Sequence, residues 1–270
     1  MTTGGDGSYA YENVRAGQGE RLRTLEGLLD EGTIRQLEAR GVGDGWRCLE
    51  VGAGGGSIAA WLAERVAPGG FVLATDLDTT VLAGLSHPNL EIQVHDVLSD
   101  ELPEGAFDLV HLRLVLAWLG EPRFALRRLI AALEPGGWLV AEEMDFLSVV
   151  PDPRLPADSR DLFARAVQAH NTVLAQRHGF DPYYGRQLVG DLEEAGFIEI
   201  GCEGRAAMWH GGAPGGAIWR LSLAQIRAPI IESGLLTSAE LDAFCALCDD
   251  RRLSFQSQIT MAGWGRRPMS

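Results

Sequence analysis

A short apolar strand that runs into a glycine-rich turn and then into a helix is the feature that most constrains the fold. Residues 48–57 read Cys-Leu-Glu-Val-Gly-Ala-Gly-Gly-Gly-Ser, and a helical pattern continues to residue 66. Glycine at such a turn permits positive φ and close approach of the backbone to a ligand. A helix N-terminus adds backbone N–H groups without intrahelical partners. The segment predicts a ligand site at the edge of a sheet, although a tight turn without a ligand would also use these glycines.

Apolar runs and amphipathic segments alternate on both sides of this turn. Strands are predicted at residues 46–51, 71–75, 90–95, 107–112 and 138–142, and helices at residues 57–66, 79–85 and 123–133. Strands that alternate with helices form a parallel sheet covered by helices on both faces. We therefore expect an α/β fold that binds its ligand at the carboxyl ends of the strands.

The remaining parts of the chain are an N-terminal segment and a less regular second half. Residues 1–45 contain a polar arm and a helical stretch at 20–40, which Gly27 and Gly32 are expected to break. Three prolines between residues 151 and 156 mark a linker. Beyond it we expect helices at residues 159–177, 186–195, 217–234 and 239–249, and strands at 197–203, with an extension toward 209, and at 254–264.

Charge, hydropathy and cysteine content argue against several classes of protein. The chain has 23 Lys and Arg against 37 Asp and Glu, and the net charge of −14 repels nucleic-acid phosphates. It has no apolar run long enough to span a membrane and no signal-peptide core, so we expect a cytoplasmic protein with no membrane or nucleic-acid partner. Cys245 and Cys248 have CxxC spacing inside a helical pattern, and we expect free thiols and no metal site.

Acidic residues lie at the ends of the first three predicted strands, at Glu50, Asp76 and Asp96. A carboxylate that closes the second strand can accept both hydroxyls of a ribose. Read from Gly54, the turn also fits the dinucleotide pattern GxGxxA. Three acids on one rim repel a pyrophosphate and tolerate a sulfonium cation, which weakens the alternative of an NAD-dependent oxidoreductase.

These motifs, in this order, resemble the class I S-adenosylmethionine-dependent methyltransferases, especially the small-molecule branch. The segment from Glu50 to Gly56 is similar to the ExGxGxG motif of that family, and residues 107–111 and 133–137 resemble its fourth-strand motif and the turn before its fifth strand. The ordered match covers residues 46–146. The resemblance therefore covers the predicted parallel strands and the turns that follow them.

The resemblance implies a cofactor, S-adenosylmethionine, and a set of residues that hold it. Asp76 matches the acid that binds the ribose, Leu77 the apolar residue beside the adenine, and Asp96 with Val97 the pair that holds the adenine amino group. The residues expected at the cofactor are Tyr11, Arg23, Glu50, Gly52, Gly54, Gly56, Asp76, Leu77, Asp96, Val97 and Arg113. Among them, Arg113, Arg23 and Tyr11 are the candidates for the methionine carboxylate.

The resemblance also implies a complete fold. This is a Rossmann-like, seven-stranded, mostly parallel sheet with helices on both faces and an antiparallel last strand, which residues 254–264 supply beside residues 197–209. The helices between these two strands form an insertion that, with the N-terminal arm, acts as a lid over the substrate. We expect a single class I methyltransferase domain with an N-terminal part (1–45), a cofactor-binding core (46–146) and a substrate-side part (147–270).

Methyl transfer from a sulfonium is an in-line displacement, so alignment of the reactants is the main task of the protein. A general base helps when the acceptor carries a proton. His111, at the carboxyl end of the fourth strand, is the first candidate, and His170 is the second. Glu142, Glu143 and Asp145 end the fifth strand, where alternation turns only some of them inward.

We therefore expect an S-adenosylmethionine-dependent methyltransferase (EC 2.1.1.-) that acts at O, N or C of a small organic metabolite. A cofactor-bound protein of the same fold that catalyses a cyclisation or rearrangement without methylation is a further alternative. The sequence leaves open the acceptor and the oligomeric state, for which a homodimer is one option.

Overall fold

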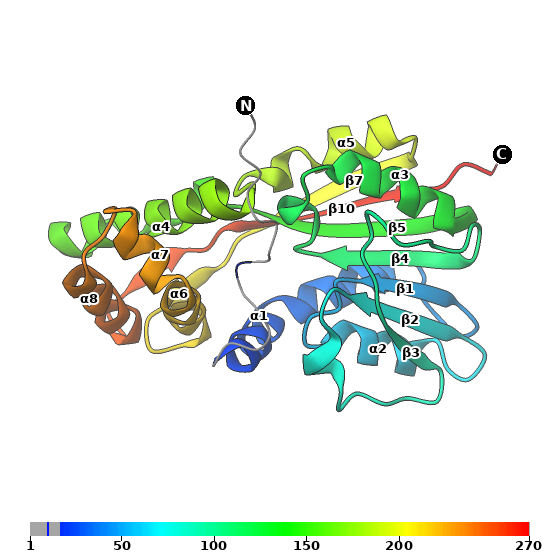
Figure 1. Cartoon of the computed structure of the whole chain (residues 1–270), viewed down its shortest axis with the longest axis horizontal. Helices are drawn as coiled ribbons and strands as arrows, with labels where there is room; N and C mark the ends of the chain where they lie inside the picture. Colours follow the sequence, from blue (N-terminus) through cyan, green and yellow to red (C-terminus); the bar gives the residue numbers. More distant parts are fainter. Residues whose placement is uncertain (1–9, 11–16, 270) are drawn as a thin grey trace. The chain divides into compact units, whose positions relative to one another are not determined.

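The computed structural model describes residue 10 and residues 17–269, which form two compact units (Figure 1). The first, here called the sheet unit, consists of Leu29–Met144, Tyr184–Gly204 and Thr260–Ser270. The second, the helical unit, consists of the described residues up to Leu28 together with Asp145–Tyr183 and Arg205–Ile259. The cofactor-binding core expected at residues 46–146 ends within two residues of Met144, where the chain leaves the sheet unit. The sheet unit also contains two later segments of the chain, which that expectation did not include.

The sheet unit contains a seven-stranded sheet in the order β3-β2-β1-β4-β5-β10-β7. The strands are β1 (Arg47–Val51), β2 (Phe71–Asp76), β3 (Leu90–Val94), β4 (Phe107–Arg113), β5 (Leu133–Asp145), β7 (Ile198–Arg205) and β10 (Ile259–Arg266). The pairs β1–β2, β1–β4, β2–β3 and β4–β5 are parallel. Gly136, near the start of β5, bonds to Arg267, just past the end of β10, so the last strand is antiparallel. The predicted sheet is confirmed.

Helices cover both faces of this sheet. The helices of the unit are the second half of α1 (Gln18–Ala39), α2 (Ser57–Arg65), α3 (Pro122–Ala132) and α5 (Leu188–Ala195), with short 3-10 turns η1 (Thr79–Leu82), η2 (Leu116–Trp118) and η4 (Tyr184–Arg186). Leu37 of α1 and Leu62 of α2 pack in one core with Cys48 and Leu109. The alternate strand residues, such as Val110, are also fully buried, so the opposite face is covered as well.

The helical unit has its own core. It contains α4 (Ala157–His178), α6 (Pro214–Gln225), α7 (Arg227–Glu232), α8 (Ser238–Asp249), the 3-10 turn η3 (Phe146–Ser148) and a three-stranded sheet, β6-β9-β8, formed by Val150–Pro151, Ser254–Gln256 and Met208–His210. Phe163, Phe244 and Phe255 are fully buried at its centre. The unit thus includes the helices predicted as an insertion between the last two strands.

Two predicted helices differ from the structure. Gly27 and Gly32 do not break α1, which is continuous. A helical glycine costs about 1 kcal/mol, and burial of Leu29 and Leu37 offsets that cost. The helix predicted at 217–234 is two helices, because α6 ends at Gln225 and α7 restarts with Pro229 in its first turn, where a missing N–H is tolerated.

Three predictions about strands also differ. Residues 254–264 form β9 and β10, which belong to different sheets, and the predicted extension toward residue 209 is the separate strand β8. Residues 133–137, predicted as a turn, begin β5, and the β4–β5 register shifts between Phe107 and Leu109. Each difference places a chain segment in a sheet through pairing with a distant segment, which local pattern does not encode.

Among the described residues, no helix combines the length and apolar character needed to cross a membrane. In the same part of the chain, His, Cys, Asp and Glu side chains form no group of three or more with the arrangement of a metal site. Cys48, Cys202, Cys245 and Cys248 are free thiols.

Candidate functional site

The glycine turn of residues 52–56 joins β1 to α2 at the carboxyl edge of the parallel strands. Gly52, Gly54 and Gly56 have φ values of 68°, 57° and 87°. A Cβ atom on Gly52 would lie 2.5 Å from Cγ2 of Val115, so the turn leaves no room for a side chain there. No side chain caps the first turn of α2. The backbone N–H groups at this edge therefore suit an electron-rich ligand group.

Asp76, the last residue of β2, fastens the middle of the turn. One carboxyl oxygen accepts the backbone N–H of Gly54 at 2.9 Å, and the other accepts that of Asp78 at 3.1 Å. Burial raises the pKa of Asp76, although these hydrogen bonds act in the opposite direction. The next side chain, Leu77, is 63% exposed, which gives this edge an open apolar surface beside a carboxylate.

A second acidic and apolar pair follows β3. Asp96 accepts the backbone N–H of Leu98 at 2.8 Å, and its own N–H donates to Asp100 at 2.9 Å. Val97 is buried. Since β3 lies next to β2 in the sheet, this pair lies at the same carboxyl edge as Asp76.

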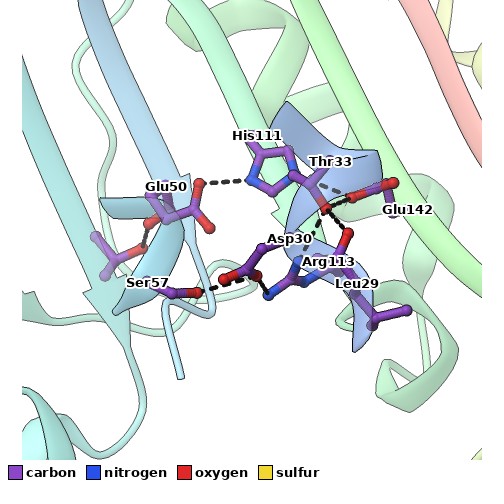
Figure 2. A network of polar contacts seen from close by, with 9 residues as sticks. Leu29, Asp30, Thr33, Glu50, Ser57, His111, Arg113 and Glu142 are labelled. Carbon is purple, nitrogen blue, oxygen red and sulfur yellow. Dashed lines mark hydrogen bonds and ion pairs between the residues drawn. The ribbon is translucent and has the colours of Figure 1, made fainter. Parts of the chain in front are cut away.

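A buried charged network lies on the sheet face that α1 covers (Figure 2). Glu50 lies opposite His111 across β1 and β4, and Arg113 lies opposite Glu142 across β4 and β5. Side chains two residues apart on a strand share a face, so the parallel register brings all four together. Nδ1 of His111 donates to Oε2 of Glu50 at 2.6 Å, and Nε2 faces Oε2 of Glu142 at 3.7 Å. The imidazole thus lies between two carboxylates.

The two carboxylates determine the charge of His111. Burial lowers the pKa of His111, but the charges and hydrogen bonds of Glu50 and Glu142 outweigh burial and raise it to about 9. Burial acts to raise the pKa of Glu142, and the contacts with His111 and Thr33 lower it below its usual value. At neutral pH the imidazole is therefore a cation held between two anions.

Helix α1 supplies the other part of the network. The Thr33 hydroxyl donates to Glu142 and accepts a hydrogen bond from Nη1 of Arg113 at 2.9 Å. Oδ1 of Asp30 lies 2.9 Å from Nη2 of Arg113 and accepts the hydroxyl of Ser57 at 3.1 Å. The network thus continues from the strand ends to the first residue of α2.

Glu143 projects from the opposite face of β5. Its carboxyl group accepts the backbone N–H groups of Val115 at 2.9 Å and Leu116 at 2.6 Å. Burial raises the pKa of Glu143 to about 8, against the effect of these bonds. They hold the chain just after β4, where Leu114 has a φ of 60°, unusual for a residue with a side chain. Alternation therefore separates the neighbouring acids of β5, as predicted.

The comparisons with known proteins agree with this geometry. The family described as Methyltransferase domain matches residues 20–198. The chain belongs to this methyltransferase family. Methyltransferase str3 of Strobilurus tenacellus is 31% identical over 177 residues, which cover 65% of this chain and 61% of that protein. The match thus spans about three fifths of the relative's length.

Solved structures share the fold of this methyltransferase. A putative methyltransferase from Bacillus halodurans superposes with a TM-score of 0.55 at 20% identity, over 88% of this chain and 99% of that one. The [4+2]-cyclase SpnF superposes with a TM-score of 0.51 at 21% identity, over 89% and 81% of the two chains. The predicted resemblance to class I methyltransferases is confirmed at the level of family and fold.

The turn of the methyltransferase fits a nucleoside cofactor that carries a positive charge. Gly52, packed against Val115, keeps the backbone of the turn free of a side chain, Asp76 places a carboxylate at the next strand end, and Leu77 offers an exposed apolar surface. With His111 protonated, its network has three carboxylates (Glu50, Glu142 and Asp30) against two cations, a net charge of −1. That excess suits a cation better than a pyrophosphate.

The structure brings most of the predicted site residues into the sheet unit. These are Glu50, Gly52, Gly54, Gly56, Asp76, Leu77, Asp96, Val97, His111 and Arg113. Arg113 donates to Thr33 and pairs with Asp30, so both terminal nitrogens already have partners on α1. Arg23 is exposed on the first half of α1, in the helical unit, and Tyr11 lies outside the described residues.

His170, the second predicted base, belongs to the helical unit. Its ring centroid lies 5.3 Å from that of Trp219 and 5.7 Å from that of Phe146, and Nδ1 lies 2.9 Å from Oδ1 of Asn171. Burial lowers the pKa of His170 to about 4. His170 is therefore a neutral imidazole among aromatic rings at pH 7.

The sequence did not single out Asp30, Thr33 or Ser57 as site residues. The only available signal was spacing, because residues three apart lie on one face of a helix. That spacing does not reveal which strand this face of α1 packs against. The contact of Asp30 with Arg113 joins residues that are far apart in the chain.

Proposed function

We propose that the protein transfers a methyl group from S-adenosylmethionine to O, N or C of a small organic molecule. The observation that carries the proposal is the glycine turn, which Asp76 fastens through the N–H of Gly54 beside the exposed Leu77. The bound cofactor supplies a methyl group already activated on a sulfonium. The residues of the chain then have to bind the cofactor, orient the acceptor toward the methyl group and exclude water.

The proposed contacts of the cofactor follow the strand ends. Asp76 accepts the ribose hydroxyls, Leu77 and Val97 contact the adenine, and Asp96 accepts its amino group. The backbone of Gly52, Gly54 and Gly56 approaches the remainder of the cofactor. Glu50 contributes charge next to this turn, held in place by His111.

We assign alignment, rather than proton transfer, as the main contribution of the protein. Orientation of reactants can supply on the order of 7–11 kcal/mol. A base that works at neutral pH has a pKa near 7, whereas His111 is fully buried with a pKa raised to about 9. This favours His111 as a positioning residue for Glu50. By the same criterion His170, whose pKa burial lowers to about 4, is a weak base at neutral pH.

The acceptor is proposed to be a small molecule. The net charge of −14 disfavours nucleic acid. The name of the relative from Strobilurus tenacellus states methyl transfer without stating an acceptor. The atom that receives the methyl group is therefore left as O, N or C.

Calorimetry and a transfer assay test the proposal together. We expect S-adenosylmethionine and S-adenosylhomocysteine to bind and NAD not to bind, because the acids at the strand ends repel its pyrophosphate. Binding of NAD alone would refute the proposal and favour an oxidoreductase. A panel of small-molecule acceptors with a labelled methyl donor then tests the reaction.

The similarity in fold to the [4+2]-cyclase SpnF is the reason to propose a second candidate function. The name of that protein states a cyclisation, so the alternative proposal is a cofactor-bound protein that catalyses a cyclisation or rearrangement without methylation. Cofactor binding with product formed but no label transferred would support that function over methylation.

A further inference from the structure

The two ends of the glycine turn are attached to the same buried network (Figure 2). Glu50, two residues before Gly52, receives the hydrogen bond of His111. Ser57, directly after Gly56, donates to Asp30 of α1. The middle of the turn is held separately, through Gly54 and Asp76. The turn is thus held at both ends and in the middle, and the contact at Ser57 depends on a helix outside the strand–turn–helix motif.

Asp30 is the residue through which α1 reaches the turn. The same oxygen, Oδ1, contacts the Ser57 hydroxyl and Nη2 of Arg113. Arg113 is itself fixed by Thr33, one helical turn further along α1. An ion pair such as Asp30–Arg113 fixes the position of the carboxylate, and hydrogen bonds to a charged acceptor are stronger than those to a neutral one. Asp30 therefore presents a rigid acceptor to Ser57.

The position of Ser57 makes this contact relevant to a ligand. Ser57 is the first residue of α2, and Gly56 before it has a φ of 87° and provides no side-chain cap. A glycine turn has more backbone freedom than any other sequence, and fixing it costs more conformational entropy. The hydrogen bond of Ser57 to Asp30 restricts the turn before a ligand binds, so less conformational entropy is lost on binding. Pre-organisation of this kind raises the affinity for the ligand.

We propose that Asp30, held by Arg113, is a positioning residue for the cofactor, which sets the glycine turn through Ser57. The second half of α1 is then part of the cofactor site, although it contributes no residue of the ExGxGxG motif. This inference rests on the proposed function for the identity of the ligand. The order of the turn in the free protein does not depend on that identity.

The first test is calorimetry with S-adenosylhomocysteine and S-adenosylmethionine. We expect Asp30→Ala to raise the Kd of both roughly tenfold, the scale for lost hydrogen bonds to a charged group. Ser57→Ala removes the contact with Asp30 but keeps the Asp30–Arg113 ion pair, so it should raise the Kd in the same direction, and the double variant should differ little from Asp30→Ala. Asp30→Asn retains an acceptor and should change the Kd about threefold or less.

Glu203→Ala is the matched control. Glu203 of β7 binds Arg35 and Gln36, so its removal loosens α1 from the sheet but keeps the contacts of Asp30 with Arg113 and Ser57. We expect a Kd within twofold of wild type. An equal rise in Kd for Glu203→Ala and Asp30→Ala would overturn the proposal, because general docking of α1 would then explain both.

Hydrogen exchange of the free protein gives a readout without cofactor or activity. The amides of Ala53, Gly54 and Gly56 are each hydrogen-bonded at 2.9 Å and report the order of the turn. We expect faster exchange in Asp30→Ala and wild-type exchange in Glu203→Ala. A wild-type Kd for Asp30→Ala overturns the inference. If wild type binds neither ligand, the proposed function fails, and wild-type exchange in Asp30→Ala then overturns this inference on its own.

Discussion

Replacement of Glu142 by glutamine tests whether His111 is a cation at neutral pH. Oε2 of Glu142 lies 3.7 Å from Nε2 of His111, while Oε2 of Glu50 lies 2.6 Å from Nδ1. Glutamine keeps the size of the side chain and an acceptor for Thr33 but removes the charge. A carboxylate at this distance favours the protonated imidazole. We therefore expect Glu142→Gln to lower the pKa of His111 from about 9 toward its ordinary value of 6.5.

The same change has a predictable effect on stability. A pKa of about 9 in the folded protein, against 6.5 in the unfolded chain, corresponds to about 3 kcal/mol at ~1.36 kcal/mol per pH unit. Because the pKa of His111 is raised on folding, this stabilisation is complete below pH 6.5 and is lost as the pH rises through 9. Glu142→Gln should therefore destabilise the protein more at about pH 6 than at about pH 10.

NMR of histidine-labelled protein measures the pKa directly, and thermal unfolding across the same pH range measures stability. The chain has six histidines, so His111→Gln serves to assign the signal of His111. Glu134→Gln is the control, because Glu134 is on the same strand but exposed. A wild-type His111 that titrates near 6.5, or one whose pKa is unchanged in Glu142→Gln, would refute the reasoning.

Three further predictions follow from other parts of the site. Asp76→Ala should weaken S-adenosylmethionine binding by roughly 1.5–3 kcal/mol in calorimetry, and an unchanged Kd would exclude Asp76 from the site. Burial raises the pKa of Glu143 to about 8, so its carboxyl group destabilises the fold increasingly between pH 4.5 and 8. Glu143→Gln should therefore raise the melting temperature at pH 8 relative to wild type and lose that advantage near pH 4.5. Hydrogen exchange in residues 152–184, a segment outside the strand–helix alternation that follows three prolines, should slow when cofactor is added, and equal protection in both states would contradict this prediction.

Much of the fold could be predicted because the pattern of the sheet unit is local. The first five strands and the glycine turn are each encoded by a short run of apolar residues or glycines. Predictions were weaker where pairing partners are far apart, as in the division of residues 254–264 between two sheets. The same limit explains the uninterrupted α1, because burial of Leu29 and Leu37 offsets the local cost of its glycines.

The sequence by itself determined the family, the order of strands and helices, and the edge of the sheet at which the glycine turn lies. These depend on residue spacing within single elements, and spacing is written directly in the chain. Only the tertiary structure decided the state of His111, because its charge depends on Glu50 and Glu142, which come from two neighbouring strands. Only the tertiary structure joined Asp30 to Ser57, because that contact requires α1 to dock on the sheet. Electrostatic energy depends on distance in space, and that distance is fixed by packing rather than by position along the chain.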